Sequence, residues 1–416
     1  MRVGIVGLGY VGLPLAVAFA EAGHEVVGLD NNEDRVAALR GARSPVEDVS
    51  DERLAGLGDA FQPVTRPAEL ARCDAITICV PTPLANHREP DLSYLVDAAT
   101  QLAGVLREGQ LVVLESTTYP GTTRERLVPI LEAGSALRAG IDFNVAFSPE
   151  RIDPGRTDFT MRTTPKVVGG LTPQCSRRAV ALYSEICDRV VEVSNPEVAE
   201  LTKLLENIFR SVNIALVNEL AQLCDLMGID IWEVVDAAST KPYGFMRFEP
   251  GPGMGGHCLP VDPFYLAFKA REHDFYTEFV ELAGKLNQAQ PRWCSRRIER
   301  ALNDRSLAVR GSKILICGVS YKAGVGDIRE SPALKIIEGL QDLGADLSYH
   351  DPHVPVLPQF GLQSVDLDPA VAEADLVCIL TAHPGIDYER LVAAAAAVID
   401  FRGVTRQVDA PNLSRM

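Results

Sequence analysis

The feature that most constrains the fold of this chain is the glycine pattern GLGYVG at residues 7–12. It follows RVGIVG, an apolar and β-branched stretch that predicts a strand, and it opens a helical pattern that ends at Gly23. The next predicted strand, HEVVGLD, ends at Asp30, which lies 18 residues after Gly12. A strand, a glycine turn, a helix and a carboxylate at the end of the next strand are typical of a dinucleotide-binding βαβ unit. The chain is therefore predicted to begin with a Rossmann-type domain.

Each glycine of this turn has an expected role. Gly7 permits the tight bend, Gly9 lets the backbone approach a pyrophosphate, and Gly12 lets the helix pack close to the strand. The diphosphate would face the helix N-terminus. A carboxylate that binds the ribose 2′-hydroxyl repels a 2′-phosphate, so Asp30 favours NAD, while Arg35 leaves NADP open as an alternative. The predicted contacts from this unit are Gly7, Gly9, Tyr10, Val11, Gly12, Asp30 and Arg35.

The rest of the chain predicts two α/β regions joined by helices. Strands at 74–80, 110–117 and 144–149 alternate with helical stretches, which predicts a parallel sheet with right-handed crossovers. A helix of about 34 residues starts near Ser194 or Asn195, with Pro196 in its first turn, and Gly228 closes it. Further strands and a helix follow from about residue 311. The predicted fold class is α/β, with two doubly wound Rossmann-like domains and a helical middle, over residues 1–193, 194–305 and 306–416.

Composition excludes several classes of protein. The net charge of −16 argues against non-specific nucleic-acid binding. No uncharged apolar run reaches 18 residues, so no membrane span is expected, and the first residues predict a strand rather than a signal peptide. The nine cysteines form no C-x-x-C pair. Eight of them are predicted to be reduced and buried in a cytoplasmic protein. No metal site is expected, because no His, Cys and Asp cluster has suitable spacing.

Four stretches differ from ordinary core sequence. The stretch GPGMGGHCLPVDPF (251–264) surrounds Cys258 with glycines and prolines. KLLENIFRSVN places Lys203, Asn207 and Arg210 at i, i+4 and i+7, on one face of the long helix. The other two are FSPERIDPG (147–155) and GVSYKAGVGDIRESPA (318–333). Each charged residue, taken alone, is also compatible with a surface position or a turn.

Together and in this order, these stretches resemble the nucleotide-sugar 6-dehydrogenases of the UDP-glucose/GDP-mannose dehydrogenase family, over nearly the whole chain. The resemblance implies an NAD-dependent, four-electron oxidation of C6 of a nucleoside-diphosphate sugar to the uronic acid. It implies that Cys258 holds the substrate as a thiohemiacetal and then as a thioester, which water hydrolyses. The last domain would bind the nucleotide, and the active site is expected in the cleft between the α/β domains. The long helix would form a homodimer or a higher oligomer.

The resemblance also assigns roles to single residues. Lys203 would favour the thiolate and stabilise oxyanions. Asn207 and Asp262 would position the water that serves as base, and Glu150 with Thr117 would activate the hydrolytic water; Thr118 is a rival for Thr117. The implied cofactor contacts also include Thr82, Thr117 and Arg329. The implied substrate contacts are Glu150, Arg151, Lys203, Asn207, Arg210, Lys241, Arg247, Gly255, Tyr321 and Lys322.

The identity of the sugar stays open at this point. His257 and Val261 stand where relatives that act on UDP-glucose or GDP-mannose have Ser and Lys, which favours UDP-N-acetylglucosamine or UDP-N-acetylmannosamine. Arg247 and Glu249 occupy a loop that is apolar or aromatic in that branch, so UDP-glucose and dTDP-glucose are alternatives. Two other classes remain: a two-electron dehydrogenase of the 3-hydroxyacid or 6-phosphogluconate type, and a nucleotide-sugar binder without catalysis.

Overall fold

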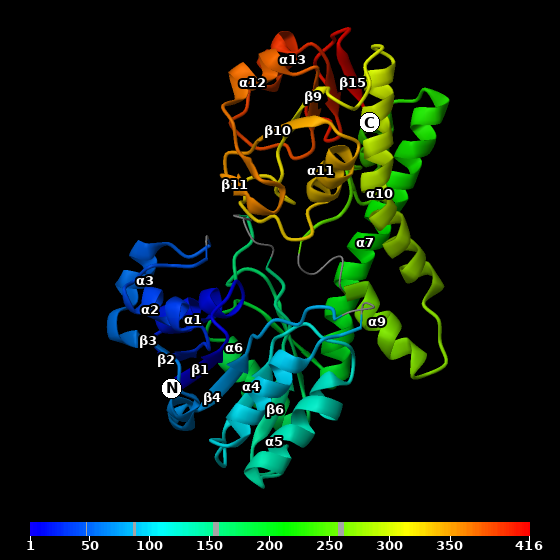
Figure 1. The fold of residues 1–416 in the computed structure, drawn as a ribbon. Coiled ribbons are helices and arrows are strands. Elements are labelled where there is room, and N and C mark those ends of the chain that lie inside the picture. Colours follow the sequence, from blue (N-terminus) through cyan, green and yellow to red (C-terminus); the bar gives the residue numbers. More distant parts are fainter. Residues whose placement is uncertain (47, 86–88, 153–157, 257–261) are drawn as a thin grey trace. The chain divides into compact units, whose positions relative to one another are not determined.

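The computed structural model describes residues 1–46, 48–85, 89–152, 158–256 and 262–416 (Figure 1). The chain divides into two units. The N-terminal unit comprises Met1–Glu206 and Phe264–Tyr276, and the C-terminal unit comprises Asn207–Pro263 and Thr277–Met416. Each unit contains its own mainly parallel sheet covered by helices, which confirms the predicted α/β fold class.

The N-terminal unit is built on an eight-stranded sheet with the order β3-β2-β1-β4-β5-β6-β7-β8. The order reverses beside β1, between β2 and β4, as expected for a doubly wound sheet. The strands are β1 (Arg2–Val6), β2 (Glu25–Leu29), β3 (Phe61–Val64), β4 (Ala75–Ile78), β5 (Leu111–Leu114), β6 (Asn144–Phe147), β7 (Lys166–Gly170) and β8 (Val190–Val193).

One pair of neighbours in this sheet corrects the prediction of a wholly parallel arrangement. β6 and β7 are antiparallel, with Ala146 opposite Gly170 and Phe147 opposite Gly169. A parallel pairing needs a crossover, usually a helix. The connection between these strands carries prolines at 149, 154 and 165, which disfavour a helix, and none forms at 148–152 or 158–165. The chain therefore turns back beside β6.

Helices cover both faces of this sheet. Because alternate strand residues point to opposite faces, Val113 packs in one core and its neighbours Val112 and Leu114 in another. The first core also receives α1 and α6, and the second receives α4 and α5. The helices are α1 (Gly12–Glu21), α2 (Glu33–Arg40), α3 (Asp51–Leu57), α4 (Ser93–Ala103), α5 (Val128–Ser135) and α6 (Pro173–Tyr183).

The long predicted helix is α7 (Pro196–Met227), of 32 residues. Its length is about 48 Å at 1.5 Å per residue. The Asn195 side chain accepts a hydrogen bond from the amide of Val198 at 2.9 Å, and Gly228 follows the last turn with φ +67°. Both ends are therefore formed by the residues that the sequence indicated. The boundary between the two units falls inside this helix.

The C-terminal unit holds a five-stranded parallel sheet with the order β10-β9-β13-β14-β15. Ile314 and Ile316 of β9 pack with α10 and α11, and Leu315 and Cys317 pack with α12 and α13 on the other face. The elements are α8 (Ile231–Ser239), α10 (Glu278–Asn303), β9 (Lys313–Cys317), α11 (Pro332–Asp342), β10 (Asp346–His350), α12 (Leu367–Glu373), β13 (Leu376–Ile379), α13 (Tyr388–Ala394), β14 (Val398–Asp400) and β15 (Leu413–Arg415), with an antiparallel pair β11 (Val356–Leu357) and β12 (Leu362–Gln363). Helix α9 (Asp262–Arg271) begins in this unit and continues into the other.

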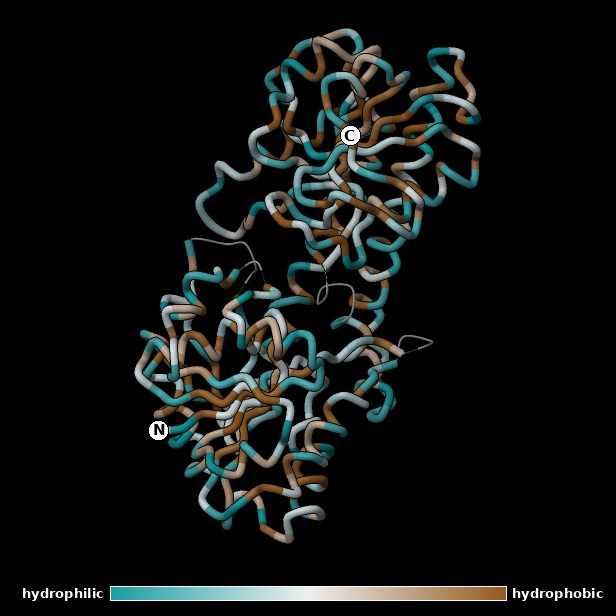
Figure 2. The backbone as a smooth tube through the Cα atoms, turned by 60° about the vertical axis from the view of Figure 1, so that its left-hand side comes forward, coloured by the Kyte–Doolittle hydropathy of each residue, from teal (hydrophilic) through white to brown (hydrophobic). Residues whose placement is uncertain are grey.

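Strands β4, β5 and β13 are buried along their whole length. Figure 2 shows the hydrophobic residues of the chain in brown. Eight cysteines, all those within the described ranges, are free and buried, as predicted. The described helices include none that is both long and apolar enough to cross a bilayer. Among the same residues no group of three or more His, Cys, Asp or Glu side chains is arranged to hold a metal ion.

Candidate active site

The turn between β1 and α1 has the backbone geometry that its glycines predict. Gly7 has φ +92°, and a Cβ there would lie 2.7 Å from the carbonyl oxygen of Cys79. A Cβ on Gly12 would lie 1.8 Å from the carbonyl oxygen of Gly7, so helix and strand meet without room for a side chain. A Cβ on Gly9 would have no described atom within 4 Å. Two glycines therefore close the turn, and the third leaves its backbone open to a ligand.

Asp30 fixes the end of β2 against this turn. Its buried carboxylate accepts hydrogen bonds from the amides of Leu8 at 2.8 Å and Asn32 at 2.9 Å. Nη1 of Arg35 donates to the same carboxylate at 2.9 Å, so the arginine that left NADP open is engaged by Asp30. An open glycine backbone, a helix N-terminus and a carboxylate at the second strand end together fit a dinucleotide.

The remaining predicted cofactor contacts lie in two places. Tyr10 is exposed and Val11 precedes α1 in the turn itself. The Thr82 hydroxyl donates to the Thr117 carbonyl at 2.8 Å, which joins the loops after β4 and β5. Arg329 belongs to the C-terminal unit, where its guanidinium pairs with Asp327 at 2.6 Å. The structure thus brings Thr82 and Thr117 together. It places Arg329 in an ion pair with Asp327 of the same turn.

The two candidate threonines after β5 differ in accessibility. Thr117 is half-buried. Thr118 is fully buried, and its hydroxyl has no hydrogen-bond partner within the described part of the chain. The more accessible side chain is that of Thr117.

Glu150 lies beside a buried charged cluster in the N-terminal unit. Its Oε1 accepts hydrogen bonds from the amides of Arg151 at 2.7 Å and Ile152 at 2.6 Å, and its Oε2 lies 3.5 Å from Nζ of Lys166. Burial raises the pKa of Glu150, but the charge of Lys166, the Ile152 amide and the charge of Lys203 outweigh it, so the pKa is lowered. Glu150 is therefore held as a carboxylate.

Sequence reasoning missed the partners in this cluster. Nζ of Lys166 donates to Glu115 at 2.8 Å, and the hydroxyl of Tyr183 donates to the other oxygen of Glu115 at 2.5 Å. Glu115 opens the stretch ESTTYPG, and Lys166 is the single charge at the start of the apolar run KVVGG. A lysine that opens a buried strand was the available signal, but its partners are distant in sequence.

Arg151, which is predicted to bind substrate, contacts two protein groups in this structure. Its Nη2 lies 2.7 Å from Glu206, and its Nη1 donates to the carbonyl of Pro165. These contacts tie the loop after β6 to α7 and to the segment before β7.

The helix α7 carries three predicted residues with different burial. Lys203 is half-buried in the N-terminal unit, Asn207 is buried and Arg210 is exposed. Nδ2 of Asn207 donates to Oδ2 of Asp262 at 2.5 Å, and both side chains are almost inaccessible. The structure therefore joins Asn207 and Asp262 directly.

Cys258, with His257 and Val261, lies outside the described residues. The glycines before it are described. A Cβ on Gly255 would lie 2.7 Å from Cβ of Tyr321, and the amide of Gly256 donates to the carbonyl of Arg329 at 3.0 Å. Gly255 and Gly256 thus lie against the Tyr321–Glu330 turn within the C-terminal unit.

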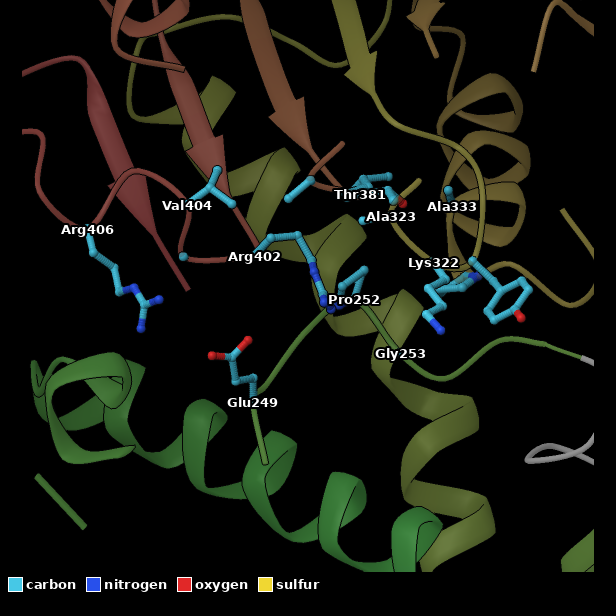
Figure 3. Close-up of a pocket in the computed structure, with 15 residues that line it drawn as sticks. Glu249, Pro252, Gly253, Lys322, Ala323, Ala333, Thr381, Arg402, Val404 and Arg406 are labelled. Carbon is cyan, nitrogen blue, oxygen red and sulfur yellow. The ribbon is translucent and has the colours of Figure 1, made fainter. Parts of the chain in front are cut away.

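A pocket of about 180 Å³ opens in the C-terminal unit beside this turn (Figure 3). It lies at the carboxyl ends of β9, β13 and β14, where ligands bind in open α/β sheets. Three cationic side chains line it, those of Lys322, Arg402 and Arg406. Figure 3 shows Arg402 directed toward Pro252, with Lys322 on one side and Arg406 on the other. This charge suits a diphosphate.

Arg402 and Arg406 are pocket residues that sequence reasoning did not single out. Both follow β14 in the stretch DFRGVTR, and arginines just after a buried strand were the available signal. Burial lowers the pKa of Arg402, while the charges of Glu249 and Asp400 oppose this effect. An anion in the pocket would favour the charged guanidinium.

Two predicted substrate residues near this pocket have other surroundings. Nη1 of Arg247 lies 2.7 Å from Asp236 and Nη2 lies 2.9 Å from Glu249, so its guanidinium sits between two carboxylates. Lys241 is exposed, and its Nζ lies 5.1 Å from the ring centroid of Tyr243. Glu249, rather than Arg247, lines the pocket.

Comparison with known proteins identifies the family. Sequence models of the UDP-glucose/GDP-mannose dehydrogenase family match in three segments: the NAD binding domain over residues 1–187, the central domain over 197–289 and the UDP binding domain over 315–407. The chain belongs to this family. It is an NAD-dependent nucleotide-sugar 6-dehydrogenase, and its cofactor is NAD. Membership in this family rules out the two other classes, the two-electron dehydrogenase of the 3-hydroxyacid type and the nucleotide-sugar binder without catalysis.

Several members of the family are similar over nearly their whole length. The chain is 37% identical over 390 residues to UDP-N-acetyl-D-glucosamine 6-dehydrogenase of Pseudomonas aeruginosa, covering 92% of this chain and 90% of the relative. It is 36% identical over 416 residues to UDP-N-acetyl-D-mannosamine dehydrogenase of Pyrococcus horikoshii, covering 98% and 96%. Among solved structures, UDP-D-ManNAc dehydrogenase from Pyrococcus horikoshii matches with a TM-score of 0.91 at 33% identity, covering 100% of this chain and 99% of that one. A UDP-glucose dehydrogenase from Pyrobaculum islandicum gives 0.89 at 27%, covering 99% and 96%.

The glycine turn of this dehydrogenase yields a paired prediction. Gly12→Ala forces a methyl group against the Gly7 carbonyl and should cost about 1–3 kcal/mol of stability. A Cβ on Gly9 has no described atom within 4 Å, so the melting temperature of Gly9→Ala should stay near wild type. Its NAD affinity should fall at least about tenfold, because the methyl group occupies the pyrophosphate approach. Thermal unfolding and NAD titration test both variants. A destabilised Gly9→Ala protein, or one with unchanged NAD affinity, would contradict the assignment.

Proposed function

We propose that this dehydrogenase oxidises a UDP-N-acetylhexosamine, UDP-N-acetylglucosamine or UDP-N-acetylmannosamine, to the uronic acid. The observation that carries the proposal is the similarity, at 36–37% identity over nearly the whole chain, to relatives named for these substrates. The sequence GGHC, with Val261 before Asp262, points to the same branch.

UDP-glucose and dTDP-glucose are the second candidates, for a specific reason. Glu249, a departure from the acetamido-sugar branch, lines the pocket of the C-terminal unit near Arg402. A carboxylate accepts hydrogen bonds but cannot donate them. It therefore changes which hydroxyl, amide or base N–H groups the pocket can bind.

In the proposed mechanism Cys258 is the nucleophile. When bound at the β1–α1 turn, NAD would supply the hydride acceptor for the oxidation at C6, with one NAD for each of the two oxidations. The thiolate adds to the aldehyde carbon to give a thiohemiacetal, whose oxidation gives a thioester. Covalent capture retains the aldehyde between the two oxidations. Lys203 supplies positive charge for the thiolate and the oxyanions.

Proton transfer is assigned to two pairs of residues. Asn207 holds Asp262 through its 2.5 Å hydrogen bond, and this pair positions the water that takes the proton of the C6 hydroxyl. Glu150, kept ionised by Lys166 and Lys203, takes a proton from the hydrolytic water, which Thr117 helps to orient.

Substrate binding is assigned mainly to the C-terminal part of the chain. Lys322 and Arg402 would bind the diphosphate, and Tyr321 and Gly255 would contact the substrate. We retain residues 1–193, 194–305 and 306–416 as the NAD-binding, central and nucleotide-sugar-binding domains. We place the enzyme in the cytoplasm, where its cysteines would remain reduced.

The central helix supports a proposal about assembly. Leu216, Leu220, Leu223 and Met227 are 52%, 42%, 50% and 61% exposed, and they recur at i, i+4, i+7 and i+11. A continuous apolar face of this kind on α7 suits a second copy of the chain. We propose a homodimer through this face.

The dimer proposal predicts a change in mass. Replacing Leu220 and Leu223 together by Glu places charges on this face and should lower the mass in light scattering about two-fold. Leu343→Glu is the matched control, since Leu343 is a 41% exposed leucine outside α7. A monomeric wild type, or a double variant that keeps the wild-type mass, would rule out this interface.

The sugar and the nucleophile can be tested together. We expect kcat/KM to be at least about tenfold higher with one UDP-N-acetylhexosamine than with UDP-glucose or dTDP-glucose.

Cys258→Ser should form no uronic acid, because an alcohol does not replace the thiolate as nucleophile. Cys224→Ser, which alters a buried cysteine of α7, is the control and should retain turnover. Preference for UDP-glucose would refute the proposed sugar, and acid formation by Cys258→Ser would refute the nucleophile.

A further inference from the structure

The buried cluster around Lys166 has a geometry that goes beyond the roles assigned above. Glu115 directly follows β5, Glu150 follows β6 by three residues, and Lys166 is the first residue of β7. Because β7 runs antiparallel to β6, its first residue lies at the edge where β6 ends. The reversed strand therefore delivers a lysine to the carboxyl edge of the sheet, beside two carboxylates.

The contacts in this cluster are unequal. Nζ of Lys166 lies 2.8 Å from Glu115 and 3.5 Å from Glu150, and the three side chains are 5%, 0% and 15% exposed. Both oxygens of Glu115 are occupied, one by Lys166 and one by the hydroxyl of Tyr183. In Glu150 the backbone amides hold Oε1, so Oε2 is the oxygen that faces Lys166. Glu115 is thus enclosed, and Glu150 is the carboxylate at the accessible end.

We propose that Lys166 is a positioning residue for the hydrolytic half of the reaction. Lys166 holds Glu150 ionised and oriented, while Glu115 limits the strength of the interaction between Lys166 and Glu150. This proposal rests on the proposed function of Glu150. In the step concerned, water hydrolyses the thioester. The oxygen of water bonds to the acyl carbon, one proton passes to Oε2 of Glu150, and the C–S bond breaks with its electron pair leaving on Cys258. Lys166 keeps its protons throughout.

The charges facing Glu150 support opposite roles for its two neighbours. The charged groups are Lys166 on β7, Lys203 on α7 and Glu115 after β5. The thiols of Cys79 after β4 and Cys187 after α6 also face Glu150, and the amides of its own loop donate to it. Burial opposes the charge of Lys166, yet Glu115 and Glu150 raise the pKa of this lysine above its ordinary value. The lysine therefore stays cationic. The charge of Glu150 raises the pKa of Glu115, so the two carboxylates repel each other while both interact with Lys166.

The test uses two substitutions that should move one pH profile in opposite directions. Lys166→Met leaves Glu150 beside Glu115 without the cation, so the pH midpoint of thioester hydrolysis should rise by about one to three units. Glu115→Gln keeps the shape of the side chain but removes its negative charge. Lys166 then interacts with Glu150 without competition from Glu115, so the pH midpoint of thioester hydrolysis should fall. The readout is the decay of the covalent acyl adduct, followed by intact-protein mass spectrometry after a single turnover across a pH series. Lys166→Met should also accumulate more adduct at neutral pH.

The chain offers a matched control lysine. Lys269 is 11% exposed in the same unit, and its Nζ lies 2.7 Å from both Glu125 and Glu272. Lys269→Met should also lower stability, because it removes a lysine that is paired with two glutamates, but it should leave the pH midpoint of thioester hydrolysis unchanged. This control separates a specific effect on Glu150 from the general cost of removing a paired lysine.

Unshifted midpoints in both variants, or shifts in the same direction, would overturn the role of Lys166. If Lys166→Met does not fold, the Glu115→Gln variant decides alone, because a fall in its midpoint supports the proposal and an unchanged midpoint refutes it. Failure of the underlying function gives a different result, since wild-type enzyme would then show no covalent adduct. An adduct in wild type with unshifted midpoints in the variants rejects only the positioning role.

Discussion

In both α/β units, a buried aspartate after the second strand binds the backbone after the first. Asp30 follows β2 and accepts the amide of Leu8, and Asp351 follows β10 and accepts the amide of Val319 at 2.7 Å. In each case the preceding residue is a glycine with positive φ, +92° at Gly7 and +82° at Gly318. Both glycines pack closely on the backbone that follows a neighbouring strand, at Cys79 after β4 and at Thr381 after β13, so a Cβ would clash. The same constraint thus shapes two ligand-binding edges.

The two units then diverge in how they use this edge. In the first unit Asp30 is paired with Arg35, and the open backbone of Gly9 is available to the NAD diphosphate. In the second unit His383 covers Asp351, with Nε2 at 3.0 Å and both side chains fully inaccessible. The second pocket instead draws its charge from Lys322, Arg402 and Arg406. One edge therefore offers a ligand backbone groups and a helix N-terminus, and the other offers cationic side chains.

Much of this arrangement follows from the sequence because it is encoded locally. The spacing from Gly7 to Asp30, and Asn195 and Gly228 at the ends of α7, reflect requirements of turns and helix ends within a few residues. Family resemblance drew attention to Asn207 and Asp262, 55 positions apart, and the structure places them in contact. Spacing alone could not have paired them.

Features that depend on pairing between distant strands could not be predicted in the same way. The reversal of β7 arises from a connection without a helix, and that reversal brings Lys166 to Glu115, 51 positions earlier in the chain. A single charge before an apolar strand does not reveal its partner. Arg402 was missed for a related reason, since its role depends on the loop around Pro252 that approaches it.

The central claim is that one active site carries out two oxidations on a substrate held by Cys258. The most direct measurement is the amount of NADH formed for each nucleotide sugar consumed, in a reaction run to completion. We expect about two NADH per sugar, with uronic acid as the product. About one NADH per sugar, with free aldehyde as the product, would contradict it.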